Sequence, residues 1–286
     1  MAEQPATSGA HVSSAGHAMA TGDWLDDHFA TAQPEYTAMV RAAGFQPGWH
    51  VLDAGCGGGA FLPLLADLVG VTGRLAALDL APENVAAIEA RLETWALPCA
   101  VEARVGSLTS LPYPDASFDG VWCANVTQYL SDEDLAVALA ELRRVVRPGG
   151  LVAVKEVDAT LARLTTPDPL LLLRNQEVAS RDGTVQVRGM MRGPGLRAWL
   201  VRAGLVEVWG RSTLIERFAP HPPVERRFLA NVYRSYAERA ATRDLSPEDL
   251  AGWAWLRDHA EDWVDAPGHY YREGHVLTVG RVPGNH

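Results

Sequence analysis

The chain has 286 residues, of which 48% are hydrophobic and 21% are charged, and its formal net charge is -10 at pH 7. These values predict a globular protein with one large α/β domain, or one domain with a sizeable insertion. They argue against a broad binding surface for nucleic acid, whose phosphates would be repelled. A bilayer-spanning helix is also not expected, because the apolar runs fall far short of ~20 residues.

The three cysteines, Cys56, Cys99 and Cys123, are unevenly spaced and form no C-x-x-C pair. They predict neither a disulfide framework nor a zinc site, and no metal is expected. The N-terminus shows no charged segment followed by an apolar core, so no secretory signal is expected. The cytoplasm is the simplest compartment.

Strand and helix patterns alternate along the first half of the chain. Residues 1–18 are small and polar and are expected to be flexible. Residues 24–43 are compatible with one or two short helices, with Pro34 able to lie in a first turn. The predicted strands are then 50–55, 74–80, 100–107, 118–126 and 151–157, and the predicted helices are 60–70, 81–96 and 131–150. Such alternation predicts parallel strands joined by crossover helices.

The helix at 131–150 has Ser131 at its N-cap and is expected to stop at Pro148-Gly149-Gly150. After the fifth strand the alternation ends. The later elements are a loose stretch over 158–191, a helix over 193–205, a strand over 206–216, two helical pieces within 219–272 and a last strand over 275–282. We therefore expect one domain over 19–286, with helical cap or lid insertions at about 158–191 and 219–272.

A glycine-rich loop, "VLDAGCGGGAF" at residues 51–61, follows the first predicted strand. Gly55, Gly57 and Ala60 formally satisfy the G-x-G-x-x-A fingerprint of dinucleotide-binding proteins. Asp53 at the strand tip argues against that ligand, because its carboxylate would repel a pyrophosphate. The ammonium and sulfonium groups of S-adenosylmethionine are compatible with an acid at this position.

A second acid, Asp79, ends the second predicted strand. A carboxylate there can accept hydrogen bonds from both ribose hydroxyls of a bound nucleoside. Taken alone, Asp79 fits NAD equally well, so it indicates a ribose but does not choose the cofactor.

Residues 45–155 resemble the class I S-adenosylmethionine-dependent methyltransferases, in particular the ubiquinone/menaquinone-type small-molecule branch. Four stretches are similar to family motifs, in the family's order and spacing: "VLDAGCGGG", "LAALDL", "VGSLTSLPYPDASFDGV" and "LRRVVRPGGLVAV". The resemblance implies a Rossmann-like, doubly wound α/β sheet of seven strands, with the last strand antiparallel and inserted beside the fifth. It also implies S-adenosyl-L-methionine as the cofactor.

By the same resemblance, the glycines cradle the methionine part of the cofactor, Asp79 binds the ribose and Leu80 packs on the adenine. Asn125 lines the methionine end. The family usually shows glycine-aspartate-alanine where this chain has Gly106-Ser107-Leu108, so the adenine partner here is a weaker, uncharged hydroxyl. The predicted cofactor-binding residues are Asp53, Gly55, Cys56, Gly57, Gly59, Asp79, Leu80, Ser107, Leu108 and Asn125.

Methyl transfer mainly requires alignment of the two reactants, because the sulfonium is already activated. A general base is needed only when the attacking atom carries a proton of high pKa. Glu156, just past the fifth predicted strand, is the first candidate, followed by Tyr129 and His28. For every candidate other than Glu156 a structural role is favoured, and these are Tyr129, His28, Asp158, His221, His269 and His275.

These residues predict methyl transfer to an oxygen, nitrogen or carbon of a small-molecule metabolite, in secondary or cofactor metabolism. The alternative is a protein of the same fold that binds the cofactor but catalyses another reaction, such as a cyclisation, or serves as a binding module. The expected partner is a small-molecule acceptor, with neither nucleic acid nor membrane. The chain is expected to be a monomer or a homodimer.

Overall fold

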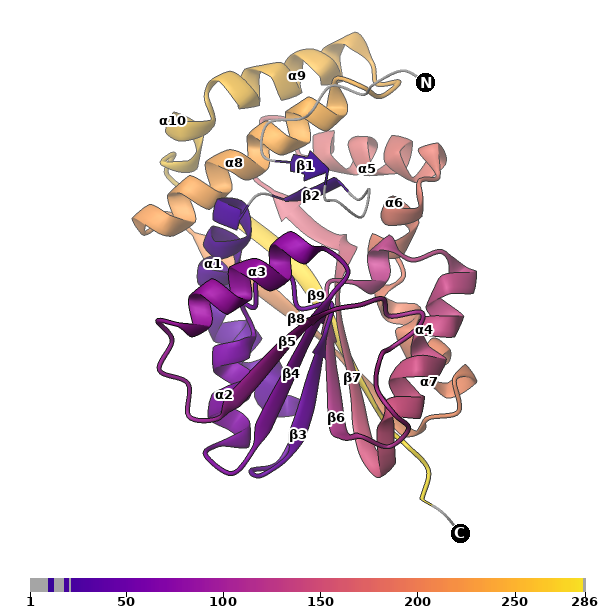
Figure 1. Ribbon diagram of the computed structural model, residues 1–286. Helices are drawn as coiled ribbons and strands as arrows, with labels where there is room; N and C mark the ends of the chain where they lie inside the picture. The colour runs from indigo at the N-terminus through magenta and orange to yellow at the C-terminus, as the bar shows by residue number, and fades with distance from the viewer. Residues whose placement is uncertain (1–9, 13–17, 21, 285–286) are drawn as a thin grey trace.

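The computed structural model describes residues 10–12, 18–20 and 22–284 (Figure 1). Two short strands, β1 (Ala10–Val12) and β2 (Ala18–Ala20), pair in antiparallel fashion. The rest of the segment expected to be flexible, residues 1–9 and 13–17, lies outside the described residues.

A seven-stranded sheet forms the centre of the protein, in the order β5-β4-β3-β6-β7-β9-β8. Its last strand, β9, is antiparallel to both neighbours, β7 and β8, whereas the other pairs are parallel. The predicted sheet is therefore confirmed. The strands are β3 (His50–Ala54), β4 (Arg74–Asp79), β5 (Ala100–Val105), β6 (Phe118–Ala124), β7 (Val146–Leu164), β8 (Val206–Phe218) and β9 (Tyr270–Arg281).

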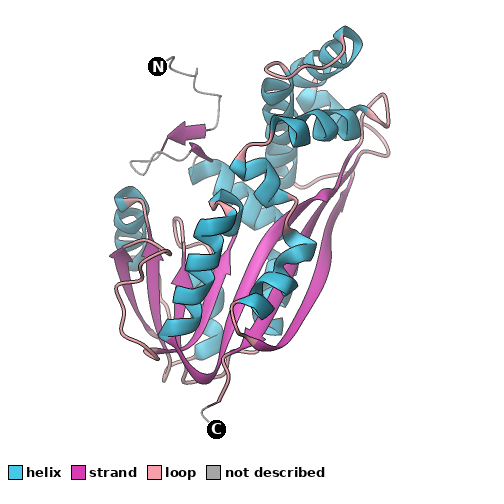
Figure 2. Ribbon diagram, turned by 90° about the vertical axis from the view of Figure 1, so that its right-hand side faces the viewer, coloured by secondary structure: helices cyan, strands magenta, loops and turns pink. Residues whose placement is uncertain are grey.

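Helices cover both faces of this sheet, as Figure 2 shows. Because successive strand residues point to opposite faces, Val51 belongs to one hydrophobic cluster and Leu52 to another. The Val51 face is covered by α1 (Gly22–Ala42), α2 (Leu62–Val69) and α3 (Pro82–Leu92); the Leu52 face is covered by α4 (Asp132–Val145) and α7 (Leu196–Arg202).

Two details of the sequence-based expectation were wrong. Pro34 lies inside a single long helix, α1, rather than in a first turn. The helix α4 ends at Val145, before the proline and glycines that were expected to stop it. Val146 is buried and already pairs with Phe118, so strand pairing takes over from the helix at this point.

A group of helices, here called the cap, lies beyond the carboxyl ends of the parallel strands (Figure 1). It comprises α5 (Leu171–Asp182), α6 (Val185–Met190), α8 (Pro223–Ala240), α9 (Pro247–Asp258) and α10 (Ala260–Val264). Residues such as Leu172, Tyr233 and Trp253 form a third hydrophobic cluster there. No helix in the described part of the chain is long and apolar enough to cross a membrane.

Candidate functional site

The glycine loop between β3 and α2 is held against the neighbouring strand. The backbone N–H groups of Gly55 and Cys56 both donate to the carbonyl oxygen of Leu78, at 2.7 and 3.0 Å. A Cβ added at Gly55 would lie 2.4 Å from the side chain of Val126, whereas no described atom lies within 4 Å of one added at Gly57. Both glycines have positive φ, 77° and 51°. The loop is therefore tightly packed at Gly55 and open at Gly57, where a ligand can approach its backbone.

Asp79, at the end of β4, organises this loop. Its carboxylate accepts hydrogen bonds from the N–H of Gly57 (2.8 Å), the N–H of Ala81 (2.9 Å) and the side-chain amide of Asn84 (3.0 Å). Nearby, Asp53 is only 1% exposed, and its Oδ2 has no partner among the residues described. Burial and the adjacent charge of Asp79 raise the pKa of Asp53 to about 8.

Apolar side chains lie at the ends of β4 and β5, next to the loop after β5. Leu80 is 43% exposed and Val105 is 46% exposed. The hydroxyl of Ser107 accepts the N–H of Thr109 at 3.2 Å and forms a hydrogen bond with the Thr109 hydroxyl. Leu108 is buried in the core, so its side chain does not face a ligand and only its backbone is left for such a contact.

Two other predicted cofactor residues have defined surroundings. Asn125, directly after β6, has a φ of 59°, an uncommon conformation that asparagine tolerates better than most residues. Its carbonyl accepts a hydrogen bond from the Gln128 side chain at 3.1 Å. Cys56 is buried, and burial raises the pKa of its thiol well above the usual range, which favours packing over reactivity.

Glu156, the first candidate base, lies inside β7 rather than beyond its end, because β7 continues to Leu164. Its Oε2 accepts the Thr127 hydroxyl at 2.7 Å and the Gln128 N–H at 3.0 Å. Burial raises the pKa of this carboxyl. Glu156 thus anchors the short 3-10 turn over Thr127–Tyr129. Burial, with a contribution from Glu156, also raises the pKa of Tyr129 to about 12.

His28, the third candidate, meets residues of the last strand in a polar cluster. Its Nε2 lies 2.6 Å from Glu273 Oε1, and His275 Nε2 lies 3.3 Å from the same oxygen. The Tyr36 hydroxyl is 3.4 Å from His28 Nε2 and 3.5 Å from His275 Nε2. We call His28, Tyr36, Glu273 and His275 the His–Glu cluster. Burial lowers the pKa of His275 to about 4, so its imidazole is neutral at pH 7.

The His–Glu cluster is connected to the glycine loop by Tyr36, whose ring contacts both Lys155 and Phe61. The Lys155 ammonium lies 4.1 Å from the centroid of the Tyr36 ring and donates to Asn125 Oδ1 at 2.8 Å. The same Tyr36 ring packs at 5.3 Å against Phe61, which follows the glycine loop. The sequence reasoning missed Tyr36, Lys155 and Glu273. For Lys155 there was a signal, since a charge inside an apolar strand demands a partner.

The other candidates lie elsewhere. His221 Nε2 is 2.8 Å from His269 Nδ1, and His269 Nε2 is 2.8 Å from the Tyr233 hydroxyl, at the base of the cap. Asp158 is buried, and its Oδ1 accepts both the N–H and the hydroxyl of Thr160. Each of these groups already has a structural partner.

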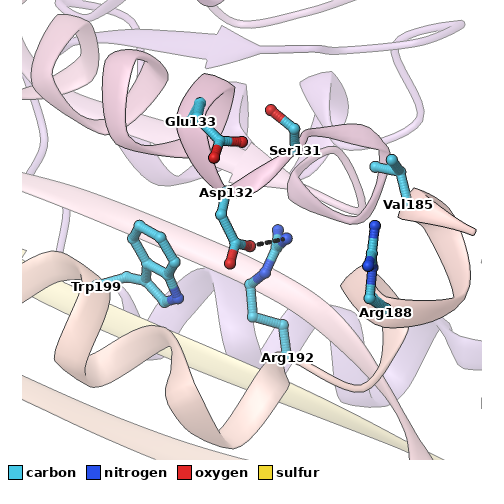
Figure 3. A pocket seen from close by; sticks show the side chains of 7 residues that line it. All are labelled: Ser131, Asp132, Glu133, Val185, Arg188, Arg192 and Trp199. Atoms are coloured by element: carbon cyan, nitrogen blue, oxygen red, sulfur yellow. Dashed lines mark hydrogen bonds and ion pairs between the residues drawn. The ribbon is translucent and has the colours of Figure 1, made fainter. Parts of the chain in front are cut away.

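A separate hollow of about 420 Å³ lies where the N-terminus of α4 meets α6 and α7 (Figure 3). Asp132 and Arg192 form an ion pair of 2.8 Å across it. Its lining residues are Ser131, Asp132, Glu133, Val185, Arg188, Arg192 and Trp199. None of them is a predicted cofactor residue, and α4 and α7 cover the face of the sheet opposite α1.

The sheet order, the glycine loop after its first parallel strand and the acid after its second define a Rossmann-like nucleoside-binding protein. A family model described as "Methyltransferase domain" matches residues 52–154. A Mycolicibacterium smegmatis protein named "Probable S-adenosylmethionine-dependent methyltransferase" is 30% identical over 212 residues, covering 70% of this chain and 75% of that protein. The chain belongs to the S-adenosylmethionine-dependent methyltransferases, and S-adenosylmethionine is its cofactor.

Two further comparisons concern a second relative and, for the fold alone, a solved structure. A ubiquinone biosynthesis O-methyltransferase of Xylella fastidiosa is 31% identical over 163 residues, covering 55% of this chain and 61% of that protein. The fold is similar to a Haemonchus contortus phosphoethanolamine N-methyltransferase, with a TM-score of 0.54 and 15% identity, over 92% of this chain and 58% of that one. The chain spans about half the length of other curated relatives that it matches, 41% of one and 56% of another.

The residues present fit this cofactor. The unpartnered Oδ2 of Asp53 is a buried carboxyl oxygen next to the glycine loop, and a cationic ligand beside it would favour its ionised form. The open backbone at Gly57 and the exposed side chain of Leu80 leave polar and apolar surface for a nucleoside amino acid.

Proposed function

We propose that this protein transfers a methyl group from S-adenosylmethionine to a small-molecule acceptor held between the glycine loop and the cap. The observation that carries the proposal is the His–Glu cluster, four polar side chains that converge from α1 and β9 beside the cofactor residues. Burying several titratable side chains together costs free energy that only hydrogen bonds and pairing offset, and such clusters are common at functional sites. The quinone-type name of one relative supports a small metabolite as acceptor.

The cofactor would be held by the residues predicted from the sequence. We expect the glycine loop to meet the methionine part of the cofactor at its open backbone around Gly57, Asp79 to accept the ribose hydroxyls and Leu80 to pack on the adenine. Asp53 and Asn125 lie at the methionine end. When bound, the cofactor supplies a methyl group on a positively charged sulfur. Ser107 can serve the adenine only in part, since its hydroxyl already bonds Thr109.

The acceptor's nucleophilic atom would face the His–Glu cluster. The Phe228 ring stacks on His28 at 4.9 Å with an interplanar angle of 5°, which shields one face of the imidazole from water. Tyr271 donates its hydroxyl proton to Glu273 Oε2 at 2.8 Å and fixes the carboxylate. The cluster therefore offers oriented acceptors for a proton that leaves the nucleophile. Glu156 acts at a distance, by holding the turn that follows Asn125.

The segments 158–191 and 219–272 would form the walls of the acceptor site. The connection from β8 to β9 leaves the sheet at Phe218 and returns at Tyr270, at the end where the cofactor residues lie. A short hairpin would join these strands, yet the chain inserts three helices with their own hydrophobic cluster. Closed walls suit a small acceptor better than a macromolecule.

The test is release of S-adenosylhomocysteine by the purified protein in the presence of acceptor panels that carry hydroxyl, amine or acidic C–H groups. We expect release with one panel, and a loss of turnover in Glu273→Gln that is absent in Glu89→Gln, which changes an exposed glutamate on α3. Conversion of an acceptor without release of S-adenosylhomocysteine would support the alternative, a cofactor-bound enzyme of another reaction. No conversion of any kind by a protein that binds S-adenosylhomocysteine would contradict the proposal.

A further inference from the structure

We propose that His28, Glu273 and His275 form a binding site for a divalent transition-metal ion of the Zn²⁺ type, which takes an oxygen of the acceptor as a further ligand. No metal was expected from the sequence, because its cysteines have no metal-ligand spacing and His28 is far from the other two donors in the chain. The donors instead come from α1 and β9, and His28 and Glu273 are 245 residues apart in the chain.

The distances between donor atoms carry this inference. His28 Nε2, Glu273 Oε1 and His275 Nε2 all lie within 4.8 Å of one another. Zinc binds nitrogen and oxygen donors at ~2.0–2.2 Å in tetrahedral sites, which places neighbouring donors about 3.3–3.5 Å apart. His275 Nε2 is 3.3 Å from Glu273 Oε1, which is the tetrahedral spacing for that pair of ligands.

The same distances argue against a network held by hydrogen bonds alone. Hydrogen bonds between nitrogen and oxygen are usually ~2.7–3.2 Å long, and three of the four contacts in the cluster exceed this range. Only His28 Nε2 to Glu273 Oε1, at 2.6 Å, is a short hydrogen bond. That pair must separate by about 0.7 Å to admit an ion with tetrahedral spacing. His28 can provide this movement by sliding in the plane of its ring along Phe228, since its side chain is 19% exposed and the stacking holds only the tilt of the ring.

The surroundings fix two of the three ligands. The Tyr271 hydroxyl holds the outer oxygen of Glu273, and Phe228 stacks on the ring of His28. His275 Nδ1 has no partner among the residues that the structure describes, so its orientation depends on packing alone. Metal-bound histidines usually have a partner at the second nitrogen. We therefore expect weaker affinity than in sites where every ligand is supported.

Two imidazoles and one carboxylate suit zinc and related first-row ions better than magnesium or calcium, which prefer oxygen donors only. Three protein ligands leave a fourth position open, as in catalytic zinc sites. This step rests on the proposed methyl transfer. With the ion bound, His28 Nε2, Glu273 Oε1 and His275 Nε2 are ligands and no longer take the proton, so an acceptor hydroxyl bound there gives its proton to water. Its oxygen then forms a bond to the methyl carbon while the carbon–sulfur bond breaks, and the electron pair stays on sulfur.

The experiment measures metal binding without any acceptor. The protein is stripped with a chelator and titrated with Zn²⁺ by calorimetry and with Co²⁺ by visible absorption. We expect one ion per chain and the visible bands of four-coordinate Co²⁺. Loss of one supporting contact to a ligand costs ~10–100-fold in affinity, so Tyr271→Phe should fall in that range and Glu273→Gln or His28→Gln should lose more. The control is His259→Gln, which removes an exposed cap histidine and should change nothing.

Each outcome decides the metal site by itself. Binding of one ion that is lost in both ligand variants, while these still bind S-adenosylhomocysteine, supports the site even if no acceptor is ever methylated. Absence of stoichiometric binding in the folded wild-type protein overturns it, as does equal binding by wild type, Glu273→Gln and His28→Gln. In those cases methyl transfer remains testable by product release, so the two proposals fail separately.

Discussion

Lys155 and Asn125 are joined by two hydrogen bonds of 2.8 Å, one in each direction. The Lys155 ammonium donates to Oδ1 of Asn125, and the Asn125 backbone N–H donates to the carbonyl oxygen of Lys155. The pair ties the end of β6 to β7 between the glycine loop and the His–Glu cluster. A buried lysine at this place links the cofactor residues to the proposed acceptor site.

The first prediction concerns this pair. Asn125→Ala loses the acceptor of a charged hydrogen bond and keeps a strained positive φ, whereas Asn125→Gly loses only the hydrogen bond. Burial lowers the pKa of Lys155 to about 7, so the measurement is made below that pH, where the lysine is charged. Hydrogen bonds to charged groups contribute about 1.5–3 kcal/mol, and a left-handed residue other than glycine costs about 1–2 kcal/mol. In urea unfolding, Asn125→Gly should therefore have a free energy of unfolding only slightly below that of wild type, because glycine relieves the strain. Asn125→Ala should have the lowest value of the three. Equal stability of the two variants would contradict the strain at this position.

The second prediction compares two glycines that both have a left-handed backbone conformation. Gly57 and Gly268 both have positive φ, and no described atom lies within 4 Å of a Cβ added at either. Alanine at each position should cost about 1–2 kcal/mol of unfolding free energy. Only Gly57→Ala should weaken the binding of S-adenosylhomocysteine, which calorimetry measures. The reason is that the alanine side chain enters the space proposed for the cofactor. If both variants bind alike, the ligand does not approach the loop at Gly57.

The third prediction concerns the pH dependence of stability at Asp53. Its pKa is about 8 in the folded protein, against 3.8 in the unfolded chain. Between these values the unfolded chain loses the proton and the folded protein keeps it, so wild type loses stability as pH rises. Asp53→Asn has no titrating group at this position. Its free energy of unfolding, relative to that of wild type, should therefore rise from pH 4 to pH 8 by up to about 1.4 kcal/mol per pH unit. Urea unfolding over this pH range measures the difference.

Asp53→Asn should also weaken binding of S-adenosylmethionine more than binding of S-adenosylhomocysteine, most clearly above pH 8, where the Asp53 carboxyl is ionised and favours the sulfonium charge that only S-adenosylmethionine carries. Equal losses for the two ligands would place Asp53 away from the sulfur. A pH-independent stability difference would mean that the carboxyl is ionised in the folded protein.

The sheet could be predicted from sequence because its signals are local. Short apolar runs, each followed by glycine, proline or an acid, predicted β3, β4 and β6. The antiparallel last strand was implied by the resemblance to the family. Glu156 was misplaced because the length of β7 depends on a distant partner. Beyond Val157 the strand continues by pairing with β9, as at Arg163 and Arg272, and nothing in the sequence around 158–164 shows that partner.

The cofactor residues were predicted as a set, and their roles stay predictions, whereas the His–Glu cluster was not foreseen. His28 and His275 were candidates, each by itself. Their convergence on Glu273 follows from how α1 packs across the sheet, a long-range contact that one sequence does not reveal. A charged residue in an apolar strand, Lys155, was the local sign that a buried polar site lies there.

The fourth prediction concerns Glu156. A general base there would lose about 10²–10⁴-fold in turnover when its charge is removed. Because its carboxylate is occupied by Thr127 and Gln128, Glu156→Gln should instead stay within about tenfold of wild-type turnover, and its pH–rate profile should keep its shape. Thr127→Val, which removes the same contact from the other side, is the matched control. If Glu156→Gln loses turnover with a changed pH–rate profile and Thr127→Val does not, Glu156 is a general base after all.

The last prediction concerns the buried histidine pair at the base of the cap. Burial, and then the neighbouring His221, lower the pKa of His269 to about 4, while Asp265 opposes this shift. In the unfolded chain the group titrates near 6.5. As pH falls below 6.5, the unfolded chain therefore gains a proton that the folded protein does not accept until about pH 4.

The stability supplied by neutral His269 is thus complete above pH 6.5 and is lost as pH falls from there toward 4. His269→Gln cannot take up that proton, so it should be less stable than wild type at pH 7.5, where it lacks the hydrogen bonds to His221 and Tyr233. The gap should narrow steadily toward pH 4.5. Urea midpoints across this range measure it, with His259→Gln as the control for an exposed histidine. Both proteins keep His275, so its own titration cancels in the comparison. A gap that stays constant with pH would show that His269 titrates at the same pH in the folded and the unfolded protein, so that burial does not lower its pKa.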